Sequence, residues 1–164
     1  MFGKSNQKHF ILIADDSEED SFFIERALRE STRFQVIGSV RNGEEAIAYL
    51  AGQGPYADRQ LWPFPHLFLV DLKMPQVDGF KVLEWLRKQN FPSLKVAVLS
   101  GSSILADIQK VQSLGVNAFY TKSIEHARLM ELVRNLEAFL LTPNLPMEFP
   151  SLPTNPSRVS GSQV

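Results

Sequence analysis

The sequence predicts an α/β fold in which one parallel sheet of five strands is covered by five helices, in three layers. Short apolar segments alternate strictly with longer amphipathic ones, which is typical of a parallel sheet with helices on both faces. One apolar run, residues 67–70 (LFLV), is uninterrupted and so indicates a strand buried on both faces. No repeat of fixed period is visible, so a solenoid is not expected.

Length and composition exclude several functional classes. The 164 residues suffice for one domain with a substantial core, and a formal net charge of −1 favours neither nucleic acid nor anionic lipid as a partner. The absence of cysteine excludes disulfide bonds and thiolate metal sites. The amino terminus lacks the apolar core of a signal peptide, and no apolar run has the length of a membrane span. We therefore expect a cytoplasmic protein that binds neither nucleic acid nor membrane.

Five short segments have the composition of strands. They are residues 9–14 (HFILIA), 34–40 (FQVIGSV), 67–70 (LFLV), 94–99 (LKVAVL) and 118–121 (AFYT). The second is the weakest of these, because Gly38 interrupts it.

A helix is predicted after each strand. Ser17 and Asn42 carry side chains that can cap the first two helices, and Gly52 is suited to ending the second. The first helix should end near Ser31. The last should run from about residue 125 to 141, where the amphipathic period is clearest.

Two segments fall outside this alternation. Residues 54–65 form a long loop that is either elaborated or mobile, in which Trp62 and Phe64 either pack inward, the favoured interpretation, or form a partner-binding patch. From residue 142 the chain is rich in proline and loses its apolar period. We therefore predict a folded domain over residues 8–141 and a disordered or surface-draped tail over 142–164.

Polar side chains stand where four of the strands end. Asp15 and Asp16 follow the first strand, Asp71 the third, Ser100 the fourth and Lys122 the fifth. Because the carboxyl ends of parallel strands share one edge, these groups should meet in the crevice where ligands bind to such sheets. Three crowded carboxylates need a cation, and oxygen ligands suit Mg²⁺.

This combination of groups is suited to phosphoryl transfer. An Asp71 oxygen left free by the metal could act as a nucleophile and form an aspartyl phosphate, with Ser100 and Lys122 donating to the phosphoryl oxygens. Each feature also has a simpler interpretation: a helix start at residues 15–17, and a turn at Ser100 followed by a helix cap at 101–103. Their joint placement at strand ends favours a site.

Four segments together resemble the receiver domain of two-component response regulators. They are residues 13–16 (IADD), 70–79 (VDLKMPQVDG), 99–101 (LSG) and 115–122 (GVNAFYTK). Each is common alone, but their order and spacing are specific, and the resemblance spans roughly residues 8 to 141. It implies a flavodoxin-like three-layer sandwich with the strand order 2-1-3-4-5.

The resemblance also implies a role for each acidic residue. Asp71 is similar to the family's phosphoacceptor. Asp16 and Asp71 are expected to bind Mg²⁺ directly, with Asp15 acting nearby through water. The backbone carbonyl of Lys73 is the further expected ligand.

Three other residues match the family's switch. Ser100 resembles the hydroxyl that moves onto the phosphoryl group, and Lys122 the lysine that binds the phosphoryl oxygens. Phe119 resembles the aromatic residue that turns inward as the hydroxyl moves, although as an apolar residue it would by default be core. The expected output face is made by the fourth helix, fifth strand and fifth helix.

The chain departs from the family pattern at two places. Ser123 replaces the proline that usually follows the lysine in a cis peptide; because a cis bond before another residue costs about 2.5–4 kcal/mol, we expect a trans bond and a shifted loop. Lys73 and Ser102 occupy the two positions whose side chains tune how fast the family loses its phosphoryl group.

These features predict a signalling protein rather than an enzyme, although it would help to catalyse its own phosphorylation and dephosphorylation. A sensor histidine kinase or phosphotransfer protein would supply the phosphoryl group, and a downstream protein would read the changed surface. The long loop and extended carboxyl terminus loosely resemble single-domain regulators paired with bacterial phytochromes, and a homodimer through the fourth and fifth helices is one expectation. The alternatives are a pseudo-receiver that docks partners without phosphorylation, and a small aspartyl-nucleophile phosphatase, which is disfavoured because Lys73 stands where such enzymes carry a second acid.

Overall fold

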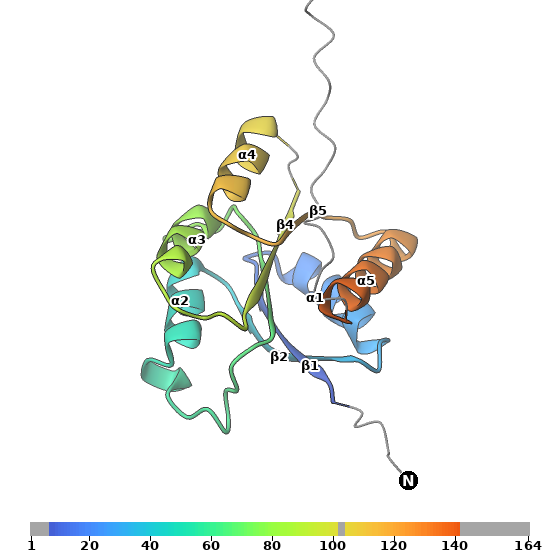
Figure 1. The fold of residues 1–164 in the computed structure, drawn as a ribbon. Coiled ribbons are helices and arrows are strands. Elements are labelled where there is room, and N and C mark those ends of the chain that lie inside the picture. The colour runs from blue at the N-terminus through green and yellow to red at the C-terminus, as the bar shows by residue number, and fades with distance from the viewer. Residues whose placement is uncertain (1–6, 102–103, 142–164) are drawn as a thin grey trace, which may run out of the picture.

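The computed structural model describes residues 7–101 and 104–141, and these form a five-stranded parallel sheet (Figure 1). The strand order is β2-β1-β3-β4-β5, so the predicted fold class and order are confirmed. The strands are β1 (His9–Ala14), β2 (Phe34–Val40), β3 (Leu67–Val70), β4 (Lys95–Ser100) and β5 (Ala118–Thr121).

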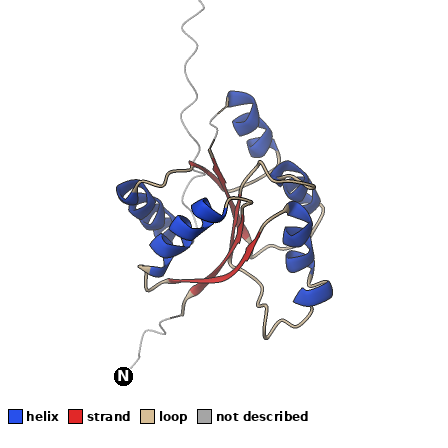
Figure 2. Cartoon of the chain, turned by 180° about the vertical axis from the view of Figure 1, so that it is seen from behind, coloured by secondary structure: helices blue, strands red, loops and turns tan. Residues whose placement is uncertain are grey.

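Helices cover both faces of the sheet and complete three layers (Figures 1 and 2). On one face lie α1 (Glu18–Arg29) and α5 (His126–Leu141), which contact each other. On the other face lie α2 (Gly43–Ala51), α3 (Gly79–Arg87) and α4 (Leu105–Ser113). Among the described helices, none is both long and apolar enough to cross a membrane.

The apolar run of β3 is buried on both faces, as its sequence predicts. Leu67 and Leu69 belong to the hydrophobic cluster under α1 and α5. Phe68 and Val70 belong to the cluster under α2, α3 and α4. Successive side chains of a strand point to opposite faces, so an uninterrupted apolar run supplies both cores at once.

Side chains cap the first three helices at their amino ends. Ser17 accepts a hydrogen bond from the Asp20 N–H at 3.2 Å, and Asn42 accepts one from the Glu45 N–H at 2.8 Å, as predicted. Asp78 caps α3 in the same way, at 3.0 Å from the Lys81 nitrogen. These caps satisfy backbone donors that the helix itself leaves unpaired.

Several predicted boundaries were wrong by one or two residues. Strand β4 begins at Lys95 rather than Leu94, because the Leu94 N–H turns back to the Phe91 carbonyl whereas the Lys95 N–H donates to the His66 carbonyl beside it. Helix α1 ends at Arg29, with Glu30 as its C-cap, rather than near Ser31. Helix α5 begins at residue 126 rather than 125.

The expected cap of the fourth helix is not tested by the described residues. Ile104 is the N-cap of α4, and no side-chain capping hydrogen bond is found there among the described residues. Residues 102 and 103 of the segment expected to cap it lie outside the described residues, as does the predicted tail at 142–164.

The long loop after α2 is elaborated. It contains a short 3-10 helix, η1 (Gly54–Tyr56), and its Trp62 ring packs edge-on against Tyr49 and Tyr56 at centroid distances of 6.0 and 5.3 Å. The Arg59 guanidinium donates to the carbonyls of Tyr49 and Leu50, both at 2.9 Å, in the last turn of α2. Packing is therefore the confirmed interpretation for Trp62.

Phe64 follows the same pattern as Trp62. Its ring centroid lies 5.0 Å from that of Phe91, and the Phe91 centroid lies 6.1 Å from that of Trp85 in α3. Both Phe64 and Trp85 pack against the core under α2, α3 and α4.

Candidate functional site

The carboxyl edge of the sheet brings the predicted site residues together. Asp71 continues the pairing of β3 with β1, since its N–H donates to the Ala14 carbonyl at 2.9 Å. The Lys122 N–H donates in the same way to the Ser100 carbonyl at 2.8 Å. At this edge lies a cavity of about 330 Å³, lined by Asp16, Ser17, Asp20, Asp71, Lys73, Ser100, Gly101 and Lys122.

The Lys122 ammonium lies among three carboxylates. Its Nζ is 2.7 Å from Asp15 Oδ2, 2.9 Å from Asp71 Oδ2 and 3.0 Å from Asp20 Oδ2. The Lys122 side chain is only 13% exposed. Charge-assisted hydrogen bonds shielded from water in this way are stronger than those at a surface.

Burial and pairing act in opposite directions on the charges of the site. Burial raises the pKa of Asp15, and the hydrogen bonds from Lys122 and from the Ser17 N–H only partly oppose this. Burial alone would lower the pKa of Lys122, but its hydrogen bonds to Asp15 and Asp71 outweigh burial and raise that pKa. The lysine therefore stays positively charged among its carboxylate partners.

The acidic residues fit a divalent cation. Asp15, Asp16 and Asp71 can each offer an oxygen such that the three atoms lie within 4.8 Å of one another. Asp15 and Asp71 are buried, whereas Asp16 is exposed to solvent. An all-oxygen donor set of this kind suits a hard ion that keeps some of its water ligands.

Both oxygens of Asp71 are held by neighbouring groups. Oδ2 contacts Lys122, and Oδ1 accepts from the Lys73 N–H at 3.4 Å. The residue is 6% exposed and still faces the cavity, so a small anionic group can reach it. The expected role of the Lys73 carbonyl as a metal ligand stays a prediction.

The loop that follows Asp71 is positioned by a glycine. The Gly79 N–H donates to the Leu72 carbonyl at 2.9 Å, and a Cβ at Gly79 would lie only 2.2 Å from the Asp71 carbonyl oxygen. No side chain fits such a contact with the backbone. The Asp78-Gly79 pair of the sequence motif thus caps α3 and holds the start of this helix against the end of β3.

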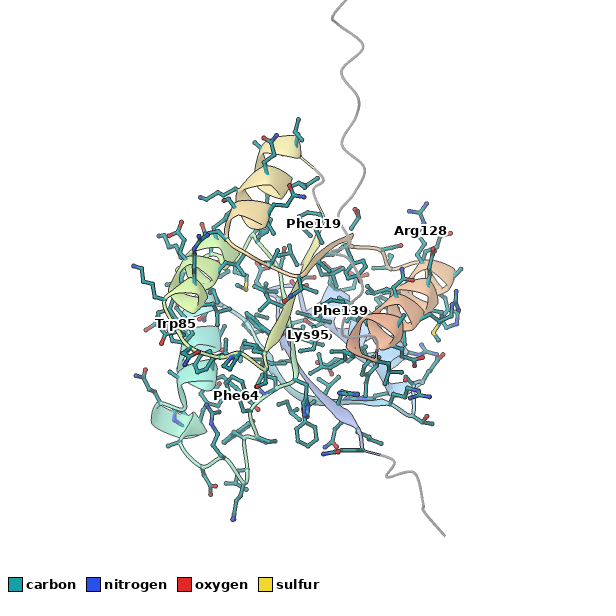
Figure 3. The ribbon with its side chains drawn as sticks, in the orientation of Figure 1. Phe64, Trp85, Lys95, Phe119, Arg128 and Phe139 are labelled. Carbon is teal, nitrogen blue, oxygen red and sulfur yellow. The ribbon has the colours of Figure 1, made fainter. Side chains whose placement is uncertain are left out.

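The two predicted switch residues are both buried. Ser100 and Phe119 are each 2% exposed, and Phe119 packs on the side of the sheet that α4 covers, in one cluster with Ile108 and Val111 (Figure 3). Phe119 is therefore a core residue in this conformation. No peptide bond among the described residues is cis, so the bond between Lys122 and Ser123 is trans, as expected.

Asp20 is a residue of the site that the sequence analysis does not identify. Its carboxylate contacts Lys122 from 102 positions away in the chain. The available signal was its place three residues after the cap Ser17, in the helical turn that stands directly beyond the end of β1.

Comparisons with known proteins agree on the nature of the domain. The family described as the response regulator receiver domain matches residues 11–134. Response regulator Rcp1 of Synechocystis is 37% identical over 144 residues, which cover 86% of this chain and 95% of Rcp1.

Two solved structures of response regulators are also similar to this chain. The phosphorylated cyanobacterial phytochrome response regulator RcpA has a TM-score of 0.72 at 34% identity, with 84% of this chain and 97% of RcpA covered. The Mn²⁺-bound form of Rcp1 has a TM-score of 0.69 at 33% identity, with coverages of 85% and 98%.

Proposed function

The chain belongs to the response regulator receiver domain family, and on this premise we propose that it accepts a phosphoryl group on Asp71 from a phosphohistidine. The donor is a sensor histidine kinase or a phosphotransfer protein. The observation that carries the proposal is the Asp71 carboxylate, which is buried, lines the edge cavity and lies 2.9 Å from the Lys122 ammonium.

The chemical step transfers one phosphoryl group without net oxidation or reduction. An Asp71 oxygen forms a bond to phosphorus while the bond between phosphorus and the histidine nitrogen breaks. The other ring nitrogen of the phosphohistidine carries a proton, so when the bonding pair returns to the leaving nitrogen, the histidine departs as neutral imidazole. Lys122 donates to a phosphoryl oxygen and so offsets the charge that accumulates there.

Asp15, Asp16 and Asp71 would hold the Mg²⁺ that such transfer requires, with the Lys73 carbonyl as a further ligand. Their oxygen donors and mutual distances support this assignment, as does the Mn²⁺-bound form of the similar protein Rcp1. When bound, the ion supplies positive charge to the phosphoryl oxygens and offsets repulsion among the carboxylates. Asp16, which is exposed to solvent, would be the third carboxylate to hold the ion.

Ser100 and Phe119 transmit the modification to the surface. The Ser100 hydroxyl moves onto the phosphoryl group, and Phe119, from the neighbouring strand β5, adjusts into the space beside it. Phosphorylation shifts the equilibrium between two arrangements of the protein, and it does so only through contacts that differ between the two. The face formed by α4, β5 and α5 is then read by a downstream protein, or by a second copy of the chain.

The source of the phosphoryl group is a phytochrome-type sensor kinase. This assignment is supported by the description of the similar protein RcpA as a phytochrome response regulator. The protein acts in the cytoplasm as a signalling domain rather than as an enzyme with a separate substrate.

The first experiment is phosphorylation by acetyl phosphate, with and without Mg²⁺, read as intact mass. We expect wild type to gain one phosphoryl mass only with Mg²⁺, and Asp71→Asn to gain none. Asp58→Asn, in the exposed loop after α2, is the matched control and should behave as wild type. Beryllofluoride, which mimics the phosphoryl group, should also change the fluorescence of Trp62 or Trp85. A folded wild type that shows neither response would be a pseudo-receiver instead.

A further inference from the structure

The Lys122 ammonium has one partner that phosphoryl transfer does not account for. Asp71 is the proposed acceptor, and Asp15 belongs to the group of carboxylates that can share a metal ion. Asp20 lies outside that group, yet its Oδ2 is 3.0 Å from Lys122 Nζ. An ammonium group has three N–H donors, so Asp15, Asp71 and Asp20 together can use all of them.

The backbone around Asp20 is held by the same short segment that holds Asp15. The Ser17 N–H donates to Asp15 Oδ1 at 3.0 Å, and the Ser17 hydroxyl accepts from the Asp20 N–H at 3.2 Å. The first turn of α1 is thereby tied to the end of β1. The Asp20 side chain, 30% exposed, lines the cavity from this turn.

We propose that Asp20 is a positioning residue that holds the Lys122 ammonium in place for the phosphoryl group. This inference rests on the proposed function. A lysine side chain is flexible, and fixing it in advance removes an entropic cost from the step in which it acts. Asp20 can do this from α1 without being a metal ligand or the acceptor.

The contacts of Lys122 change unequally when Asp71 is modified. Formation of the acyl phosphate removes the negative charge from the Asp71 carboxylate, and the N–H that Lys122 directed at it donates to a phosphoryl oxygen instead. Asp15 is shared with the proposed metal ion. The contact with Asp20 is therefore the one that keeps its partner, its charge and its position through the reaction.

Other acids of the same turn provide a control for the effect of helix charge. Glu18, Glu19 and Asp20 all stand in the first turn of α1, where negative charge suits the helix dipole. Glu19 is exposed, so Glu19→Gln removes one such charge at a distance from Lys122. Asp20→Ala removes both the charge and the acceptor, whereas Asp20→Asn keeps an acceptor oxygen of similar shape.

The test measures beryllofluoride affinity at saturating Mg²⁺ in the full chain, and hydrogen exchange of the Lys122 ammonium by ¹⁵N-lysine NMR. We expect Asp20→Ala to weaken beryllofluoride binding roughly tenfold, the factor that corresponds to about 1.4 kcal/mol for one charge-assisted hydrogen bond. The same variant should speed ammonium exchange. Asp20→Asn should restore most of the beryllofluoride affinity and most of the slow ammonium exchange. Glu19→Gln should match wild type in both measurements.

Two results would overturn the inference. One is wild-type affinity and wild-type ammonium exchange in Asp20→Ala. The other is tighter beryllofluoride binding in both Asp20 variants, which would make Asp20 a repelling charge rather than a positioning residue. If wild type itself binds no beryllofluoride, the proposed function fails, while ammonium exchange still reports whether Asp20 holds Lys122.

Discussion

The first turn of α1 shows how single polar groups differ in their contribution to stability. The Ser17 hydroxyl accepts a hydrogen bond from the Asp20 N–H, and the Ser17 N–H donates to Asp15. Ser21, four residues on, is buried, and its hydroxyl finds no hydrogen-bond partner among the described residues. A buried hydroxyl without a partner has lost its hydration and gained nothing in return.

Ser21→Ala should therefore raise the free energy of unfolding by about 0.5–1 kcal/mol, because it removes this hydroxyl and has a better helix propensity. Ser17→Ala, in the same turn, should lower the free energy of unfolding by about 1 kcal/mol through loss of the cap. Urea denaturation of both variants measures the two effects. A lower free energy of unfolding in Ser21→Ala would show that the Ser21 hydroxyl does have a partner in solution.

At the scale of elements, the connection from β3 to α3 depends on close approach of backbone to backbone. Gly79 begins α3 directly against Asp71 and Leu72, where a Cβ would meet a carbonyl oxygen at 2.2 Å. The amino end of α2 makes a similar contact, since the Gly43 N–H donates to the Val77 carbonyl at 2.9 Å. The two glycines thus hold the loop after the proposed acceptor from both sides.

Gly79→Ala should lower the free energy of unfolding by about 1–3 kcal/mol, because a backbone oxygen cannot move aside as a side chain can. It should also weaken beryllofluoride binding, since relief of the clash displaces Asp71. Gly101→Ala is the control for stability, because a Cβ there would have no neighbour within 4 Å among the residues that the structure describes. Equal stability of the two variants in thermal and urea unfolding would contradict the prediction.

Across the whole molecule, ionisable groups gather at both edges of the sheet. The carboxyl edge holds Lys122 and its carboxylates. At the amino edge the rings of His9 and His66 lie 5.4 Å apart, edge to face, and His66 Nδ1 accepts from the Phe10 N–H at 2.8 Å. Nearby, the Lys95 ammonium lies 4.7 Å from the centre of the Phe139 ring (Figure 3).

The amino edge makes stability depend on pH. Burial, followed by the nearby His66, Lys95 and Arg33, lowers the pKa of His9 below its ordinary value of 6.5. The unfolded chain then binds more protons than the folded one just below that value. This contribution to stability is therefore complete above about pH 6.5 and is lost as the pH falls.

We expect His9→Gln to flatten the loss of unfolding free energy between about pH 7 and pH 5, as measured by urea denaturation. His126→Gln, at the exposed start of α5, is the matched control for the loss of a histidine side chain. Because His9 lies at the opposite edge from the site, His9→Gln should leave beryllofluoride affinity unchanged. An unaltered slope in His9→Gln would show that this histidine does not contribute.

The sequence by itself determined the strands and the residues at the strand ends, because both follow from local pattern. Apolar runs such as residues 67–70 must be buried on both faces, and parallel strands bring Asp15, Asp71 and Lys122 to one edge. The strand order was expected from the resemblance to receiver domains. Element boundaries such as Lys95 do not follow from this pattern, because they depend on which neighbouring carbonyl a backbone N–H reaches.

Only the tertiary structure decided the contacts between groups that are distant in the chain. Three contacts depend on distances of a few ångströms between separate elements: Asp20 with Lys122, Arg59 with the end of α2, and Gly79 with Asp71. No periodicity or spacing encodes such distances, because they arise only when helices pack on the sheet. The sequence therefore predicts which groups reach the site edge, and packing decides which of them touch.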